Sequence, residues 1–227
     1  MNINWQSTSV KLTLLLGVTI ILLVGFLIAY SKTYIRYYLD LYNYRQDLVD
    51  KLTTKEIKKP TYSPNDIALG NPKAKIVIFE YSDFSCEACK QIQKTMIDLV
   101  DFYGQNNILY IFKDLPASTN ENNLLAHQAA HCAHDQNAFS AYKLTLYDHQ
   151  GAFEKPLLID YAKDLKLDEE KFTQCLEEER YKQTVLNNLN DALKLQLTGV
   201  PTLFINNQEV ANNFTFNNLR GIIEQSK

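Results

Sequence analysis

The stretch FEYSDFSCEACKQ, residues 79–91, carries two of the four cysteines of the chain, separated by two residues. It overlaps a run of β-branched and aromatic residues, KIVIFEY (75–81), and leads into KQIQKTMIDLVDFYG (90–104), which has helical periodicity. These patterns predict a buried strand, a turn that carries the cysteines, and a helix that ends at Gly104. The motif Cys86-Glu87-Ala88-Cys89 is therefore expected where a helix begins.

One segment near the N-terminus differs from the rest of the chain in composition. LTLLLGVTIILLVGFLIAY, residues 12–30, is 19 residues long without a charge, about the length that spans a bilayer. A cleaved signal peptide would have a shorter apolar region and small residues at its end, and LIAYSK (27–32) matches this poorly. We therefore expect one uncleaved transmembrane anchor at 12–30, after a short cytosolic segment at 1–11.

The charges around this segment give a conflicting indication of its orientation. Lys11 precedes it, whereas Lys32, Arg36 and Arg45 follow it, so the positive-inside rule alone would place the C-terminal part in the cytoplasm. The net charge of the whole chain is −3 and no basic face is evident, which argues against a nucleic-acid partner.

Residues 31–64 are predicted to form a helical stalk and a linker. Residues 31–59 contain neither proline nor glycine, which predicts a helix. Apolar side chains recur in it at heptad-like spacing, namely Tyr34, Tyr38, Leu41, Leu48 and Leu52. A plain stalk and a short coiled coil that forms a homodimer both fit this pattern. PTYSPNDIALGNPKA (60–74) has three prolines and a glycine and marks a boundary, so we expect one domain at 65–227.

The order of elements in this domain predicts an α/β fold. NILYIFKDL (107–115) is a second buried strand, and two strands joined by a helix should pair in parallel with a right-handed crossover. A helical region follows at about 122–197, and PTLFINNQEV (201–210) gives two short strands around an Asn-Asn turn. TFNNLRGIIEQ (215–225) closes the chain as an amphipathic helix. This order is that of a thioredoxin fold with an inserted helical domain.

Two cysteines at this place predict a redox-active dithiol. Unpaired backbone N–H groups and the helix dipole favour a thiolate on Cys86, and Cys89 lies one turn later, close enough to form a disulfide with it. Zinc is the alternative, but a zinc site usually needs a second Cys or His pair at comparable spacing, which the sequence lacks. His127, His131 and His134 share one helix face, and we interpret them as solvated side chains rather than metal ligands.

Two further features support a redox site. Glu80 is an acid in an apolar strand, so it either reaches water at the strand end or is buried and moves the proton of Cys89, with Lys113 as its partner. Pro201 opens a strand after Val200, where its missing N–H is not needed. A cis bond between them would set the Val200 backbone beside the dithiol, ready to pair with an extended substrate chain.

The segments ALGNPKAKIVIFEYSDFSCEACKQ (68–91) and GVPTLFIN (199–206) together resemble the DsbA-like thiol–disulfide oxidoreductases of the thioredoxin superfamily. The resemblance extends from about residue 68 to the C-terminus and implies that the inserted helices cap the active site. It implies that Cys86 is the cysteine that attacks or is attacked and that Cys89 is its partner. It also implies that Pro201 is a cis-proline facing them and that Glu80 occupies the place where many members carry a buried acid.

The resemblance also has implications for compartment and partners. DsbA-like domains work outside the cytoplasm, which implies a single-pass protein of the cell (inner) membrane with its catalytic domain on the periplasmic side, against the charge count. That compartment would permit a structural disulfide between Cys132 and Cys175, although buried free thiols fit equally well. Client proteins with free cysteines would be the substrates, and a membrane redox partner would recycle the enzyme. The dithiol itself carries the electrons, so no cofactor is expected.

The residues between the cysteines bear on the direction of exchange. Glu87-Ala88 replaces the Pro-His of the best-known oxidases, and a glutamate beside Cys86 should oppose its ionisation. Val200 before the proline instead resembles the oxidases. The side chains of Glu87, Ala88 and Val200 are all expected to contact the substrate. We expect an oxidase; a disulfide isomerase or reductase kept reduced by a membrane donor, and a non-catalytic peptide-binding module, are the alternatives.

Overall fold

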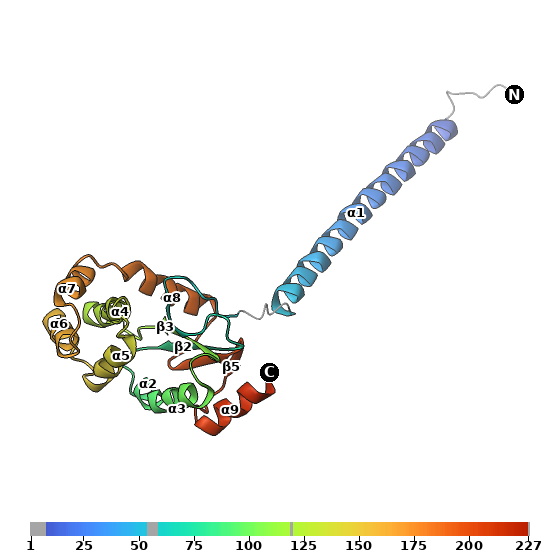
Figure 1. Cartoon of the computed structure of the whole chain (residues 1–227). Helices are drawn as coiled ribbons and strands as arrows, with labels where there is room; N and C mark the ends of the chain where they lie inside the picture. Colours follow the sequence, from blue (N-terminus) through green and yellow to red (C-terminus); the bar gives the residue numbers. More distant parts are fainter. Residues whose placement is uncertain (1–7, 54–58, 119, 227) are drawn as a thin grey trace. The chain divides into compact units, whose positions relative to one another are not determined.

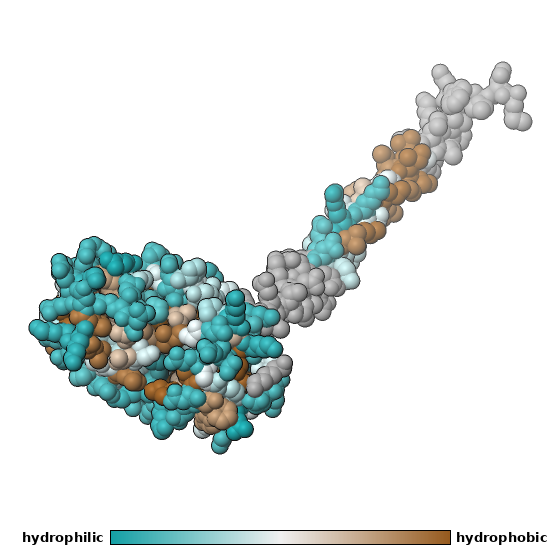
Figure 2. All heavy atoms as spheres, in the orientation of Figure 1, coloured by the Kyte–Doolittle hydropathy of each residue, from teal (hydrophilic) through white to brown (hydrophobic). Residues whose placement is uncertain are grey.

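The computed structural model describes residues 8–53, 59–118 and 120–226, which fall into two compact units, 1–57 and 58–227. The first unit contains one uninterrupted helix, α1 (Thr8–Thr53). Its segment Gly17–Asp40 is the one helix in the described part of the chain that is long and apolar enough to cross a membrane, and Figure 2 shows apolar side chains along it.

Parts of the N-terminal predictions lie outside the described residues. Within the expected cytosolic segment 1–11, residues 1–7 are not described, and the described side chains of α1 begin at Gly17. Three side chains of the predicted coiled coil also lie outside the description, namely Leu41, Leu48 and Leu52. The homodimer through the stalk therefore stays a prediction.

The second unit is built on a five-stranded sheet in the order β1-β3-β2-β4-β5. Its strands are β1 (Ile67–Gly70), β2 (Ile76–Ser82), β3 (Ile108–Asp114), β4 (Thr202–Ile205) and β5 (Gln208–Val210). The β2–β3 pair is parallel and the other pairs are antiparallel, which confirms the predicted parallel unit. Strand β1 lies in the segment predicted as a linker, because four residues between prolines are too few to show strand alternation.

Helices cover both faces of this sheet (Figure 1). One face carries α2 (Glu87–Gln91), α3 (Gln93–Tyr103) and α9 (Phe216–Gln225), and the other carries α8 (Lys182–Lys194). The remaining helices of the insertion are α4 (Glu121–His134), α5 (Phe139–Asp148), α6 (Lys155–Asp164) and α7 (Glu169–Glu177). The helix predicted from the second half of the dithiol motif is thus two helices, divided at Ile92.

Burial on both faces explains why the two central strands are apolar almost throughout. On the face of α3, the core contains Ile76, Ile78, Ile108, Tyr110 and Phe112. On the face of α8, it contains Phe79, Tyr81, Leu109, Ile111 and Phe204. Glu80 alternates with Phe79 and Tyr81 and therefore enters the core on the α3 side, where it is completely buried.

The insertion contains the second cysteine pair of the chain. Cys132 of α4 and Cys175 of α7 form a disulfide, and both side chains are buried. The structure thus pairs the two residues, which the sequence left open between a disulfide and free thiols. The bond joins two helices through cysteines that are 43 residues apart in the chain.

Replacing Cys132 and Cys175 together by alanine should lower the free energy of unfolding by about 2–4 kcal/mol, because the bond restricts a long loop of the unfolded chain. Urea unfolding of the full chain, followed by circular dichroism, measures this change. Disulfide exchange at Cys86–Cys89 should persist below the new melting temperature. An unchanged unfolding midpoint would contradict a structural role for the bond.

Candidate active site

The two cysteines of the motif differ in exposure. Cys86 is the N-cap residue of α2 and is half-buried, whereas Cys89 is completely buried in the first turn. The structure joins them in a disulfide. The Sγ of Cys86 accepts a hydrogen bond from the backbone N–H of Cys89 at 3.1 Å. A thiolate on Cys86 would keep this N–H as a donor, so the helix start stabilises the charged form.

A cis peptide bond between Val200 and Pro201 lies beside Cys86. The carbonyl oxygen of Val200 is 3.8 Å from Cys86 Sγ. Strand β4 begins directly after the proline and pairs with β2, with Thr202 opposite Tyr81, which fixes the turn against the strand that leads to the dithiol. The geometry that the resemblance implies for Pro201 is therefore present, and the Val200 backbone is next to the sulfur of Cys86.

Glu87 and Ala88 form the exposed surface of the motif. The carboxylate of Glu87 accepts a hydrogen bond from Gln91 Nε2 at 3.3 Å, one turn further along. Lys90 Nζ lies 3.2 Å from Asp148 Oδ1 at the end of α5 and joins α2 to the insertion. Both dipeptide residues thus lie on the exposed surface next to Cys86.

Glu80 lies in the core next to Cys89, at the centre of a hydrogen-bond network. Its Oε1 accepts from Gln93 Nε2 at 3.0 Å, and its Oε2 accepts from the Tyr110 hydroxyl at 2.7 Å. Gln93 Nε2 also donates to the backbone carbonyl of Cys89 at 2.7 Å. Of the two sequence interpretations of Glu80, the buried carboxylate is therefore correct, and Gln93 ties it to the buried cysteine.

The expected partnership between Glu80 and Lys113 is wrong. Lys113 is opposite Tyr81 in the parallel register, so its side chain enters the α8 face of the sheet, away from Glu80. There it forms a buried ion pair with Asp66, with 2.9 Å between Nζ and Oδ2. It also donates to the Thr61 carbonyl at 3.2 Å.

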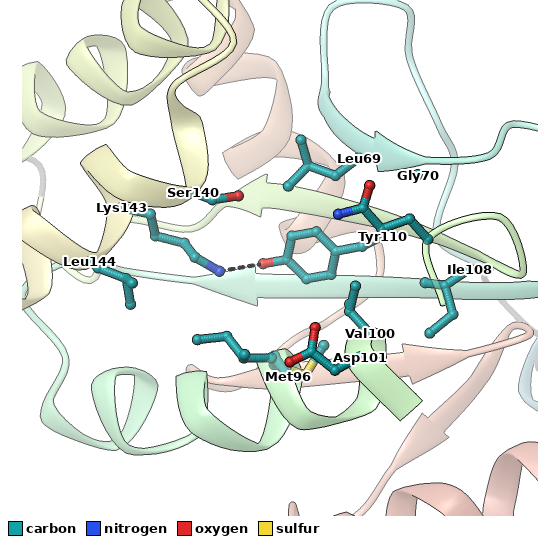
Figure 3. A pocket seen from close by; sticks show the side chains of 12 residues that line it. Leu69, Gly70, Met96, Val100, Asp101, Ile108, Tyr110, Ser140, Lys143 and Leu144 are labelled. Atoms are coloured by element: carbon teal, nitrogen blue, oxygen red, sulfur yellow. Dashed lines mark hydrogen bonds between the residues drawn. The ribbon is translucent and has the colours of Figure 1, made fainter. Parts of the chain in front are cut away.

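The cation near Glu80 is instead Lys143 of α5, which is 8% exposed. Its Nζ donates to the Tyr110 hydroxyl at 3.2 Å and lies 4.9 Å from the centre of the same ring (Figure 3). Sequence reasoning missed both residues. Tyr110 had a usable signal, because it shares a strand face with Phe112, the residue opposite Glu80. Lys143 had none, since its place depends on how the insertion packs on the sheet.

The interpretation of the histidines as solvated is also wrong for His127 and His131, whereas His134 is half-buried. His127 and His131 are buried, and both donate an N–H to the carboxylate of Asp114 at the end of β3. The distances are 2.9 Å from His127 Nδ1 and 2.8 Å from His131 Nε2, and Asn188 of α8 adds a third contact at 2.9 Å. His127 Nε2 lies 3.3 Å from Asp83, which follows β2 and precedes the dithiol.

The contacts of His127 with Asp114 and Asp83 favour its charged, doubly protonated form. Burial alone lowers its pKa, but the hydrogen bonds to Asp114 and Asp83 outweigh burial and raise the pKa to about 9. Burial likewise opposes ionisation of Asp114 and Asp83, yet the neighbouring histidines hold the pKa of both carboxyls well below 3.8. Asp83 also accepts from the backbone N–H of Ala117 at 2.9 Å. A buried imidazolium between two carboxylates therefore fixes the turn before Cys86.

These side chains bond to one another instead of converging on a common centre. In the described part of the chain, no group of three or more His, Cys, Asp or Glu residues is arranged to hold a metal ion. The groups that surround the dithiol are the Glu80 network, reached through Gln93, and the Val200–Pro201 turn.

A family model described as thioredoxin matches residues 62–225. The chain belongs to the thioredoxin family. Among solved structures, oxidised BdbD from Bacillus subtilis is similar with a TM-score of 0.64 and 18% identity, over 74% of this chain and 95% of that one. The thiol–disulfide exchange protein α-DsbA2 from Wolbachia pipientis is similar with a TM-score of 0.62 and 21% identity, over 80% and 93%. The thioredoxin fold with inserted helices, expected from the resemblance to DsbA, is thus confirmed.

Curated relatives of this family member fall into two kinds. A Rickettsia typhi protein, provisionally named a protein-disulfide oxidoreductase, is 24% identical over 191 residues, which are 80% of this chain and 70% of that protein. A sodium/proton antiporter of Salinispora arenicola is 29% identical over 152 residues, which are 66% of this chain and 23% of the antiporter. The chain thus spans about a quarter of the antiporter's length.

Proposed function

We propose that the protein is a membrane-anchored thiol–disulfide oxidoreductase that introduces disulfides into client proteins through Cys86 and Cys89. The observation that carries this proposal is the asymmetry of the dithiol. Cys86 is accessible and faces the cis Val200–Pro201 turn, whereas Cys89 is buried beside the Glu80 network. One sulfur can meet a client and the other can resolve the product, as dithiol exchange requires.

The reaction follows from these positions. A client thiolate attacks Cys86 Sγ, the Cys86–Cys89 bond breaks, and Cys89 leaves as a thiolate that takes up one proton. Glu80 is the group that transfers this proton to Cys89. A second client thiol, after losing its proton, attacks the client sulfur of the mixed disulfide and releases Cys86 as a thiolate. The client loses two electrons, and the cysteine pair gains them.

The client lies along the Val200–Pro201 turn in this proposal. Its backbone pairs with that of Val200 as an added strand, and its side chains contact Glu87 and Ala88. The thiolate stabilised at the start of α2 favours the reduced enzyme, which is what makes a disulfide donor oxidising. Glu87 opposes this, because a carboxylate beside Cys86 disfavours the thiolate.

The proposed location is the extracytoplasmic side of the cell membrane. Segment Gly17–Asp40 would provide a single-pass anchor. The disulfide between Cys132 and Cys175 supports an oxidising compartment, since such bonds are rare where thiols are kept reduced. Client proteins with free cysteines would be the substrates, and a membrane redox partner would reoxidise the dithiol.

The experiment that tests this function is an equilibrium titration of the full-length protein in detergent micelles against glutathione, with the state of Cys86–Cys89 read by thiol alkylation and mass spectrometry. A potential well above the glutathione couple supports a disulfide donor, and Glu87→Gln should move it higher still. A potential near that of thioredoxin would make the isomerase or reductase the better description. A dithiol that does not titrate would overturn the proposal.

A further inference from the structure

The hydrogen bonds around Glu80 continue beyond it to the far side of the core. Lys143 Nζ donates to the Tyr110 hydroxyl at 3.2 Å, and that hydroxyl donates to Glu80 Oε2 at 2.7 Å. Two donors, Lys143 of α5 and Tyr110 of β3, thus form a chain with a single donor direction that ends at an acceptor, Glu80 of β2. Glu80 at its inner end is joined through Gln93 to the backbone of Cys89.

The outer end of this chain lies in a pocket between α3, α5 and the β1–β3 edge of the sheet. The pocket has a volume of about 240 Å³, and both Tyr110 and Lys143 line it (Figure 3). It is lined elsewhere mainly by apolar side chains, including Met96, Val100 and Leu144. Rim residues are solvent-exposed, Leu144 by 39%, so water reaches the pocket from the surface.

Lys143 has unused donor capacity toward this pocket. An ammonium carries three N–H donors, and the described residues supply one hydrogen-bond acceptor for it, the Tyr110 oxygen. The charged or titratable groups around it are Glu80 of β2, Tyr110 of β3, Tyr147 of its own helix and Asp101 of α3 on the pocket lining. Water in the pocket is the acceptor that the remaining N–H groups can reach.

We propose that Lys143 and Tyr110 are a proton outlet, which connects Glu80 and the buried Cys89 with water in this pocket. The inference rests on the proposed function and adds the route of its proton. None of Cys86, Glu87 and Val200 lines the pocket. The proton of Cys89 therefore exchanges with solvent behind the surface that a bound client covers.

Each step of the transfer balances. Both oxygens of Glu80 accept hydrogen bonds, so the proton that it passes on comes from Tyr110. When Cys89 leaves as a thiolate, Tyr110 passes its proton to Glu80 Oε2, Glu80 gives a proton to the thiolate, and the Lys143 ammonium restores the proton of the Tyr110 oxygen. The neutral amine then takes a proton from pocket water, and the hydroxide left behind exchanges with the solvent. Burial lowers the pKa of Lys143, which eases release, while the charge of Glu80 opposes this. Burial raises the pKa of Tyr110 well above 10, so the phenol passes protons without staying ionised.

The test uses the reverse direction, in which reduced full-length protein in detergent reacts with glutathione disulfide. Cys86 first forms a mixed disulfide with glutathione, and Cys89 must then lose its proton to resolve it. Acid quenching and mass spectrometry follow both steps separately. Tyr110→Phe and Lys143→Met should slow resolution about 10²-fold, the lower end of what general acid–base catalysis contributes, while formation changes less than about twofold. Lys94→Met, an exposed lysine of α3, is the control that should change neither step.

Chemical rescue separates proton transfer from a structural effect. Lys143→Ala leaves space at the pocket, so added methylamine should restore resolution in that variant and leave Tyr110→Phe slow. An unchanged resolution rate in both Tyr110→Phe and Lys143→Met overturns the outlet, while mixed disulfide at Cys86 still supports the proposed function. If a Lys143 variant does not fold, Tyr110→Phe decides alone. Wild-type protein that forms no mixed disulfide would overturn the proposed function itself.

Discussion

In the Cys89→Ala variant, mixed disulfides between Cys86 and client proteins accumulate, and catalysed disulfide transfer falls to the uncatalysed background. The cause is the position of the two sulfurs. Cys86 remains at the start of α2, where the helix N-terminus favours its thiolate, so it still exchanges with a client disulfide. The buried thiol that would resolve the product is gone, so the covalent complex persists. Non-reducing electrophoresis of the full-length protein mixed with a scrambled or oxidised client detects the complex.

Two matched variants control this experiment. Cys86→Ala should form no covalent complex, because Cys89 is 0% exposed and cannot reach a client. Replacing Cys132 and Cys175 by alanine in the Cys89→Ala background should leave trapping through Cys86 intact, since that bond lies between α4 and α7. Equal binding of client by Cys86→Ala and wild type, with no covalent complex in Cys89→Ala, would favour the peptide-binding module.

Much of the fold could be predicted from local patterns. Strands β2 and β3 are buried on both faces and are therefore apolar over most of their length, which made them evident together with their parallel pairing. The Asn206-Asn207 turn between β4 and β5 was evident because both residues adopt the left-handed conformation that asparagine tolerates, with φ of 47° and 69°. Strand β1 was not evident from the sequence, since four residues at a sheet edge are too few to show periodicity.

The site could be predicted only where chain order determines it. Cys86, Cys89 and Glu80 lie on one strand–turn–helix, and their relative places follow from sequence distance. The partner of Glu80 was misassigned because the register sends Lys113 to the opposite face, which sequence distance does not reveal. Lys143 arrives from α5, and its approach depends on packing between the insertion and the sheet.

The contacts of the buried histidines also could not be predicted from the position of these residues in the chain. Helical spacing placed His127 and His131 on one face correctly but gave no sign of what that face meets. Two carboxylates at the ends of neighbouring parallel strands, Asp83 after β2 and Asp114 in β3, lie there. Strand ends of a parallel pair are adjacent in space, so the four residues together carried a usable signal that neither segment carried alone.

Replacing His127 by glutamine should lower the free energy of unfolding at pH 6 by about 3–5 kcal/mol, because removing one partner leaves buried carboxylates without a compensating charge. His127 contacts Asp83 and Asp114 at 3.3 and 2.9 Å with no side-chain exposure. Urea unfolding followed by circular dichroism suits the measurement, since the single tryptophan, Trp5, lies outside the domain. His149→Gln, an exposed histidine at the end of α5, is the matched control and should change little.

The pH dependence distinguishes the charge of His127 from its shape. Its folded pKa of about 9 exceeds the ordinary value of 6.5, so the stabilisation is complete below pH 6.5 and is lost as the pH rises through 9. The pKa values of Asp83 and Asp114 are lowered from 3.8, so their contribution is present above pH 3.8 and is lost as the pH falls below it. The free energy of unfolding of the wild type should therefore be greatest between pH 3.8 and pH 6.5. Its decline as the pH rises toward 9 should disappear in His127→Gln. If the variant kept the same alkaline decline, the imidazolium would not be its cause, and a neutral histidine would occupy the core between the two strand ends.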